Sequence, residues 1–242
     1  MKTPAIVLCF MLALIPVSCI YVDGWNQGIT GNGDVEEEIR DISGFTGVQV
    51  SSGIDVYLSQ DDEFEVRVVA DENLMDVIET RVKGRMLEVG TDRYGIRRAR
   101  SKKVYVSLPE LTELKISSAG DCTGQTPFTC DDLRLGISSA GDLSLEVEAD
   151  QIKLDISSSG DARLSGRART FDVSLSSAGD LHAFDLIAER VDVTVSSAGD
   201  ARVHATEEIS MSVSSAGNIY YMGDARVIHS SSSSAGDIIK KD

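Results

Sequence analysis

Seven near copies of the segment Ser-Ser-Ala-Gly-Asp recur in the second half of the chain, and they constrain its fold more than any other feature. The glycines that mark the copies are Gly120, Gly141, Gly160, Gly179, Gly199, Gly217 and Gly236. Successive glycines lie 21, 19, 19, 20, 18 and 19 residues apart, and a weaker relative, Ser51-Ser52-Gly53-Ile54-Asp55, stands upstream. Such a period predicts a solenoid, in which each unit buries its apolar face only against its neighbours.

Apolar and polar residues alternate around each glycine. The positions six and four residues before it are apolar in the first six copies: Leu114 and Ile116, Leu135 and Ile137, Leu154 and Ile156, Val173 and Leu175, Val193 and Val195, and Met211 and Val213. Alternation is the period of a half-buried strand, whereas helical repeats need apolar residues three and four apart. Each repeat is therefore expected to contain a strand, a turn whose glycine has a positive φ, a second strand and a second turn.

Equivalent strands must lie side by side, so we predict an all-β fold, a right-handed parallel β-helix with coils of about 19 residues. Ser230 and Ser232 take the inward positions of the last copy, as expected of a terminal cap. The predicted organisation is a lipoprotein signal peptide at 1–19, a flexible tether at 20–33, irregular N-terminal β coils at 34–110 and regular repeats at 111–242.

The irregular region contains weaker patterns. We expect strands at 48–50, 54–58, 64–69, 86–89 and 104–108 and a short helix at 72–78. A small β sub-domain that caps the first coil is the alternative to imperfect coils for this region.

The N-terminus resembles a secretory signal. Lys2 precedes an apolar run at 6–14, and the small residue Ser18 stands directly before Cys19. This pattern predicts cleavage and acylation at Cys19, with an ordinary signal peptide as the alternative. The expected location is the cell envelope, with a lipid anchor in the outer membrane and the body on the periplasmic side or the cell surface.

Two further cysteines, Cys122 and Cys130, would then lie in an oxidising compartment. Because they form an even pair that brackets a polar stretch with Gly124 and Pro127, we expect a disulfide. Zinc binding is the weaker alternative, since no other cysteine or histidine stands at ligand spacing nearby. The formal net charge of −16 argues against nucleic acid and anionic lipid headgroups as partners, so the lipid anchor is the only membrane contact expected.

Four features in a fixed order point to a known family. They are Gly31-Asn32-Gly33, the stretch from Phe45 to Val50 followed by Ser-Gly-Ile-Asp-Val, the segment Asp71-Glu72-Asn73-Leu74, and the repeats. Together they resemble the family of "putative auto-transporter adhesins, head GIN domain", extracytoplasmic proteins of Gram-negative bacteria that are often lipoproteins. The resemblance covers roughly residues 30–240 and implies a β-helical fold. It implies adhesion only as the family's label.

The residue after each repeat glycine is nearly always an aspartate. This column is Asp121, Asp142, Asp161, Asp180, Asp200, Asn218 and Asp237. Like charges at the strand spacing of about 4.8 Å repel, so each carboxylate is expected to accept backbone N–H groups in its own turn. Coordination of Ca²⁺, which favours several oxygen ligands, is the alternative, and no other cofactor or metal is expected.

Two residues further along, the outward column becomes basic and aromatic. With the aspartates it forms a candidate binding stripe of Asp161, Arg163, Asp180, His182, Asp200, Arg202 and Tyr220. Such a stripe suits a glycan or protein ligand, although a solvated solenoid face has the same pattern. No nucleophile elbow, phosphate-binding loop or metal triad is present, so we expect no enzymatic activity. The expected function is an envelope adhesin or ligand-binding module; a structural or sensory periplasmic lipoprotein and a carbohydrate-active enzyme are the alternatives.

Overall fold

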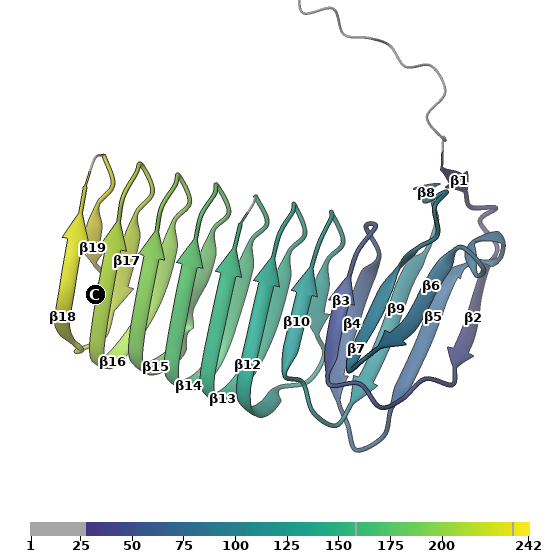
Figure 1. Cartoon of the computed structure of the whole chain (residues 1–242), viewed down its shortest axis with the longest axis horizontal. Coiled ribbons are helices and arrows are strands. Elements are labelled where there is room, and N and C mark those ends of the chain that lie inside the picture. The colour runs from purple at the N-terminus through teal and green to yellow at the C-terminus, as the bar shows by residue number, and fades with distance from the viewer. Residues whose placement is uncertain (1–27, 158, 234) are drawn as a thin grey trace, which may run out of the picture.

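The computed structural model describes residues 28–157, 159–233 and 235–242 and shows an elongated all-β solenoid (Figure 1). The predicted all-β parallel β-helix with coils of about 19 residues is confirmed. Within the described ranges the helical content is one 3₁₀ turn, η1 (Glu72–Leu74), in place of the longer helix expected at 72–78. None of the described helical segments is long and apolar enough to cross a membrane. The predicted signal peptide and Cys19 lie outside the described residues.

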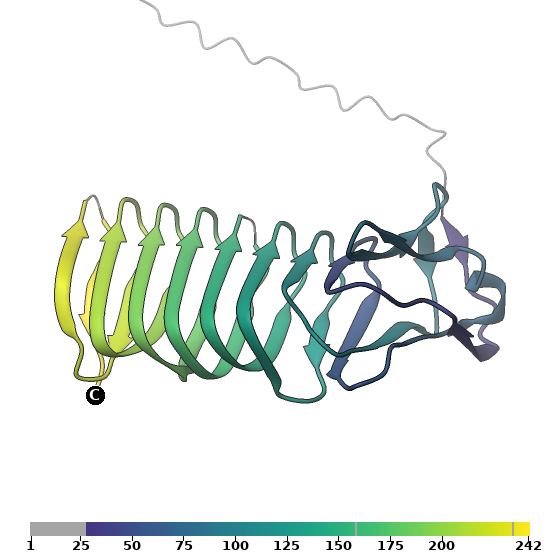
Figure 2. The same cartoon turned by 60° about the horizontal axis from the view of Figure 1, so that its bottom comes forward.

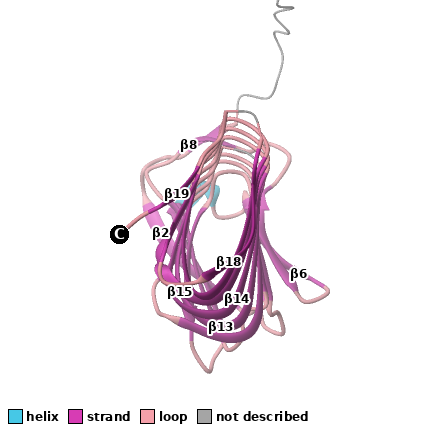
Figure 3. Ribbon diagram, turned by 90° about the vertical axis from the view of Figure 1, so that its left-hand side faces the viewer, coloured by secondary structure: helices cyan, strands magenta, loops and turns pink. Residues whose placement is uncertain are grey.

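The repeats form the regular part of the solenoid. Its strands are β10 (Glu113–Ile116), β11 (Cys122–Gly124), β12 (Phe128–Ile137), β13 (Leu143–Ile156), β14 (Ala162–Leu175), β15 (Leu181–Val195), β16 (Ala201–Val213), β17 (Ile219–Met222), β18 (Arg226–Ser232) and β19 (Ile238–Lys240). Each pairs in parallel with its equivalent in the next coil (Figure 2). The expected second turn is absent from the four coils β13 to β16, because single strands of 13 to 15 residues curve through that corner (Figure 3).

The predicted apolar columns form the core of the repeats. All twelve residues are buried, none more than 4% exposed, and they are register partners from coil to coil. In the last coil Ser230 pairs with Met211 and Ser232 with Val213, and both serines are exposed. The apolar column therefore ends where the sequence pattern ends.

The repeat glycines are required for a reason other than the expected one. None of them has a positive φ among the described residues. Instead, a Cβ added at Gly141, Gly160, Gly199, Gly217 or Gly236 would overlap the carbonyl oxygen of the glycine one coil earlier. At Gly120 it would overlap the carbonyl oxygen of Ile54. The turns stack so closely that only hydrogen fits, and the prediction of a positive φ was wrong.

The N-terminal region combines coils with antiparallel strands. Its strands are β1 (Ile29–Thr30), β2 (Val35–Arg40), β3 (Gly47–Val50), β4 (Asp55–Gln60), β5 (Glu65–Asp71), β6 (Ile78–Lys83), β7 (Met86–Thr91), β8 (Ile96–Arg98) and β9 (Lys102–Leu108). β3 and β4 pair in parallel with β10 and β11 on one side and with β7 and β9 on the other. The coils are therefore stacked out of chain order. β6 is antiparallel to β7, and β5 and β2 add antiparallel strands beyond β9.

The entry of the chain into this region is more ordered than the expected tether. Ile29 and Thr30 form β1, which pairs with β8, and the Gly33 N–H donates to Asp71 Oδ2 at 3.0 Å. Asn32 donates from its N–H to Asn73 Oδ1 at 2.9 Å. A flexible tether therefore does not extend to residue 33, because hydrogen bonds hold the segment to the body.

The two cysteines of the first repeat are free thiols rather than the expected disulfide. Cys122 is a register partner of Leu143, and Cys130 of Ala149. Those partners are six residues apart on β13, roughly 20 Å of extended chain at about 3.3 Å per residue. A disulfide joins Cα atoms only about 4.4–6.8 Å apart, so the two thiols are too far from each other.

Candidate ligand-binding site

The predicted stripe lies on the outer face of β14 to β17. Arg163, His182, Arg202 and Tyr220 are successive register partners on these four strands. Parallel strands are about 4.8 Å apart, so the four side chains form a continuous column. The residues that precede them are all fully buried: Ala162, Leu181, Ala201 and Ile219. Because side chains alternate along a strand, this burial turns the column outward.

The aspartate column is a hydrogen-bonded ladder between coils. The backbone N–H of each member donates to Oδ1 of the member one coil earlier, from Asp180 to Asp161 at 3.0 Å and from Asp200 to Asp180 at 2.8 Å. Asn218 donates to Asp200 Oδ1 from both its N–H, at 3.0 Å, and its side-chain amide, at 2.9 Å. The expected bonds to backbone N–H groups exist, but their donors lie in the next coil and not in the same turn. Binding of Ca²⁺ by this ladder stays a prediction.

Arg202 connects the ladder to the basic column. Its Nη2 lies 3.6 Å from Asp200 Oδ2, and its guanidinium carbon lies 5.3 Å from the centre of the Tyr220 ring. Its Nη1 is 4.0 Å from Asp180 Oδ2, too far for a hydrogen bond, and is buried without an acceptor among the described residues. A buried donor without a partner is costly, and Nη1 is too deeply buried to contact a ligand in this conformation.

A β-bulge interrupts the repeat beside this arginine. Between Ala183 and Ile187, β15 advances four residues while β16 advances only one, from Val203 to His204. Residues 184–186 are therefore unpaired with β16, and His204 Nδ1 contacts the carbonyl oxygen of Phe184 at 3.1 Å. Bulges redirect side chains and are frequent next to functional sites.

A cavity of about 390 Å³ adjoins the bulge. Its lining residues are Ser144, Arg163, Leu164, Ser165, His182, Phe184, Asp185 and Arg202. Two guanidinium groups can pair bidentately with a carboxylate, and the aromatic ring can cover an apolar face. The serine hydroxyls add neutral donors and acceptors. This set suits a ligand that carries both an acid group and hydroxyls.

The structure brings together three of the predicted stripe residues in this cavity, Arg163, His182 and Arg202. Asp161, Asp180 and Asp200 lie beside them in the ladder, and Tyr220 flanks Arg202. Sequence reasoning missed the lining residues of the bulge, Phe184 and Asp185. Their one sequence signal is the 20-residue step between Gly179 and Gly199, one residue longer than the two steps before it.

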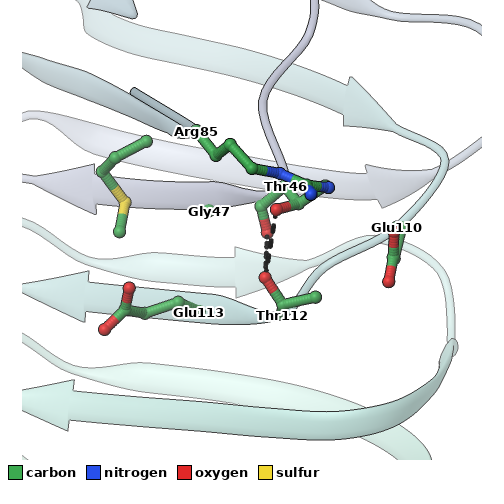
Figure 4. Close-up of a pocket in the computed structure, with 7 residues that line it drawn as sticks. Thr46, Gly47, Arg85, Glu110, Thr112 and Glu113 are labelled. Atoms are coloured by element: carbon green, nitrogen blue, oxygen red, sulfur yellow. Dashed lines mark hydrogen bonds between the residues drawn. The ribbon is translucent and has the colours of Figure 1, made fainter. Parts of the chain in front are cut away.

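A second cavity, of about 400 Å³, lies where the N-terminal coils meet the repeats (Figure 4). It is lined by Thr46, Gly47, Arg85, Met86, Glu110, Thr112 and Glu113. The hydroxyls of Thr112 and Thr46 lie 3.1 Å apart and satisfy each other, and the lining includes one arginine and two glutamates. This cavity is a seam between coils, and it holds none of the residues of the predicted stripe.

Comparison with known proteins places the chain in a family. The family described as "Putative auto-transporter adhesin, head GIN domain" matches residues 44–225, three quarters of the sequence. The chain belongs to this family. The resemblance drawn from the sequence motifs is thereby confirmed, and no curated protein matches the chain.

Solved structures share the fold. A "putative adhesin" from Bacteroides fragilis is 21% identical, with a TM-score of 0.83 over 88% of this chain and 100% of its own. A "putative lipid binding protein" from Parabacteroides distasonis is 22% identical, with a TM-score of 0.74 over 88% and 99%. A "putative adhesin" from Parabacteroides merdae is 20% identical, with a TM-score of 0.72 over 89% and 99%. At these identities the likeness shows the fold alone.

Proposed function

We propose that this family member is an adhesion module of the cell envelope, anchored through Cys19, that binds acidic glycans in the cavity beside β15. The observation that carries the proposal is the convergence of two guanidinium groups on one cavity, of which Arg202 supplies the first. Arg163 adds a second guanidinium to the same cavity. A carboxylate on a sugar supplies acceptors to both groups.

The surroundings of the cavity favour a sparsely charged glycan. The aspartate ladder runs beside the basic column and repels polyanions with closely spaced charges, such as nucleic acid. A uronic acid places its carboxylate among neutral hydroxyls, which the serines and Asp185 can bind. The column extends over four coils from Arg163 to Tyr220, so a linear chain of sugars can follow it along the solenoid.

Binding fits the acidic groups of this site better than catalysis. Glycoside hydrolysis uses two carboxyl groups about 5–9.5 Å apart on either side of the bond that is cleaved. Asp185 is the one acid among the residues that line the cavity. The neighbouring ladder carboxylates each accept a backbone N–H from the next coil, a structural role. We therefore propose a site that holds its glycan without cleaving it.

Calorimetric titration with an oligogalacturonate tests the site. Because each charged hydrogen bond contributes about 1.5–3 kcal/mol, the double variant Arg163→Ala and Arg202→Ala should bind at least about tenfold more weakly. Arg167→Ala is the matched control, since this exposed arginine lies on the same strand, β14, outside the cavity. A neutral galactan oligomer should bind far more weakly than the acidic one. Unchanged binding by the double variant, or an equal loss in the control, would contradict the proposal.

Protease accessibility on intact cells, with lysed cells as control, tests the location. Digestion of the chain in intact cells would support adhesion at the cell surface. Complete protection until lysis would overturn surface adhesion and favour the role of a periplasmic envelope protein with an internal partner.

A further inference from the structure

One segment of this acidic chain is rich in positive charge. Six of the chain's 23 basic residues lie among the eleven residues 93–103, which include no acid. They are Arg93, Arg97, Arg98, Arg100, Lys102 and Lys103, called the basic cluster below. Against a formal net charge of −16, the cluster is a local reversal of sign.

The basic cluster lies at the end of the solenoid where the described chain begins. β8, within the cluster, pairs with β1, so that Thr30 is the register partner of Arg98. Figure 1 shows β1 and β8 together at the end of the molecule opposite β18. Cys19 precedes Gly28 by nine residues, which span at most about 30 Å when fully extended. A bilayer that holds an acylated Cys19 is therefore within reach of the cluster.

A buried carboxylate fixes the cluster to this entry point. Asp71 is 1% exposed and accepts the N–H of Gly33 at 3.0 Å, that of Arg100 at 3.0 Å and that of Ser101 at 2.9 Å. The Arg100 side chain also donates from Nη1 to the Gly33 carbonyl oxygen at 3.2 Å. The cluster and the entry of the chain are thus parts of one rigid unit.

The exposed side of the cluster suits phosphate groups. Its four arginines are all exposed, and a cavity of about 380 Å³ lined by Thr30, Arg97 and Arg98 lies between β1 and β8. Arg93 stacks on Tyr94, which is 42% exposed, at 4.8 Å, and an exposed tyrosine beside basic residues is typical of a membrane–water interface.

Nearby and distant acids do not cancel this charge. The acids adjoining the cluster in the sequence, through the Asp71 contacts or across the sheet are Asp34, Asp55, Asp71, Glu72 and Asp92, and the six cations outnumber them by one. The acids of the repeats are separated from the cluster by several coils of about 4.8 Å each. The Debye length at physiological salt is about 8 Å, so most of that negative charge is screened.

We propose that the basic cluster docks on anionic phospholipid headgroups of the bilayer that holds Cys19, and so orients the solenoid relative to the membrane. The inference rests on the anchoring in the proposed function and not on its glycan site. The proposal revises the expectation that the overall acidity of the chain excludes anionic lipid. The net charge of the whole chain does not describe the local charge at the basic cluster. An acyl anchor together with a basic patch is a stronger membrane attachment than either alone.

Co-sedimentation with vesicles tests the docking without the anchor. Residues 20–242 keep every strand of the described fold, so this unacylated chain is the protein to use. It should bind vesicles that contain both phosphatidylglycerol and phosphatidylcholine and dissociate from them at high salt. It should not bind vesicles of phosphatidylcholine alone. The variant Arg93→Glu, Arg97→Glu and Arg98→Glu should lose at least about tenfold in partitioning, since each basic residue near the surface contributes about 1 kcal/mol.

The matched control is Arg134→Glu, Lys153→Glu and Arg167→Glu, which changes the net charge by the same amount on exposed positions of the repeats. It should bind like the parent chain. Three outcomes would overturn the docking proposal. They are equal losses in both variants, no binding of the parent chain to anionic vesicles, and equal binding of the parent chain to both kinds of vesicle. Glycan titration of the cluster variant and mass spectrometry of Cys19 in the native chain separate these failures from failure of the proposed function.

Discussion

The two regions of this solenoid bury the same kind of apolar strand but set their register by different means. In the repeats, the same two contacts recur between adjacent coils: closely stacked glycines and the hydrogen bonds of the aspartate ladder. In the N-terminal region, single interactions such as the buried Asp71 hold elements that occur once. The comparison indicates that repeated contacts make a uniform scaffold, whereas unique contacts decide where that scaffold starts and how it is presented.

The glycines show the same contrast. In the N-terminal region Gly33, Gly44, Gly84 and Gly95 have positive φ angles and open space where a Cβ would stand. At the glycines of the Ser-Ser-Ala-Gly-Asp segments no positive φ occurs among the described residues, and the space for a Cβ is missing. One residue type therefore serves local turn geometry at those four N-terminal positions and contact between coils at the glycines of the repeated segments.

The largest effect is expected from Gly199→Ala in the middle of the repeats. Its Cβ would overlap the carbonyl oxygen of Gly179 and lie 3.1 Å from that of Ser177, both backbone atoms that side-chain motion cannot relieve. We expect the free energy of unfolding to fall by about 3 kcal/mol or more, measured by urea denaturation.

Gly136→Ala is the matched control within the same sheet, because its Cβ would meet only Lys115 Cγ at 3.8 Å. This change should be neutral or stabilise the fold by up to about 1 kcal/mol. Gly84→Ala tests the other region, where a positive φ of 66° should cost about 1–2 kcal/mol. Equal costs at all three glycines would refute the distinction between the two regions.

The next largest loss of stability is expected from Asp71→Asn, which removes the charge of the buried carboxylate in the N-terminal region. Burial raises the pKa of Asp71, but the N–H groups of Ser101, Arg100 and Gly33 more than offset it, so the pKa lies below its usual range. Loss of the charged acceptor should cost about 2–3 kcal/mol near neutral pH. Hydrogen exchange should show the loss in the N-terminal strands and leave β13 to β16 protected.

The pH dependence of stability follows from the direction of that shift. A carboxyl whose pKa is depressed in the folded state stabilises the fold fully above its unfolded pKa of about 3.9. This stabilisation is lost as the pH falls through the lower folded pKa. The difference in urea midpoint between the parent chain and Asp71→Asn should therefore shrink below about pH 4. A difference that stays constant down to pH 2 would mean that the charge of Asp71 does not stabilise the fold.

The sequence predicted orientation well and pairing poorly. Alternation assigned the inward residues of the repeats and placed strands at β3, β4 and β9, because burial on one face has a period of two. It could not show that β9 pairs with β4 across an intervening stretch of chain, since only a repeat carries information about its neighbour. Repeat spacing likewise could not separate a glycine needed for positive φ from one needed for close approach.

The repeat pattern also predicted the regular part of the candidate site, but it did not predict the irregular part. Arg163, His182 and Arg202 share a phase of the repeat, so the sequence placed them in one column. Phe184 and Asp185 belong to a bulge that departs from that phase, and one surplus residue in a step does not say where the chain leaves the ladder. The departure from regularity is what forms the cavity.

A smaller effect is expected in the ladder, where Asp161→Ala and Asp161→Asn should differ. Alanine removes the acceptor of the Asp180 N–H, now at 3.0 Å, and should cost about 1 kcal/mol. Asparagine keeps that oxygen and removes one of several like charges, so its effect should be within about 0.5 kcal/mol. Asn218 already occupies the equivalent position and accepts the Asp237 N–H at 3.1 Å. Urea denaturation distinguishes the two outcomes, and equal destabilisation by both changes would mean that the charge is required.

The smallest effect is expected at the junction of the two regions, where dithiothreitol should leave the urea midpoint unchanged because Cys122 and Cys130 are free thiols. Burial raises the pKa of both, and the nearby Asp131 and Asp132 help to raise that of Cys130 to about 11. Since the thiolate is the reactive form, iodoacetamide near neutral pH should label Cys130 slowly and Cys122 only after unfolding. Mass spectrometry of the labelled, non-reduced protein reads both sites. A mass two hydrogen atoms lighter with no label at either cysteine would show that the strands rearrange to form the disulfide. The register of the first repeat would then be less fixed than that of the repeats that follow it.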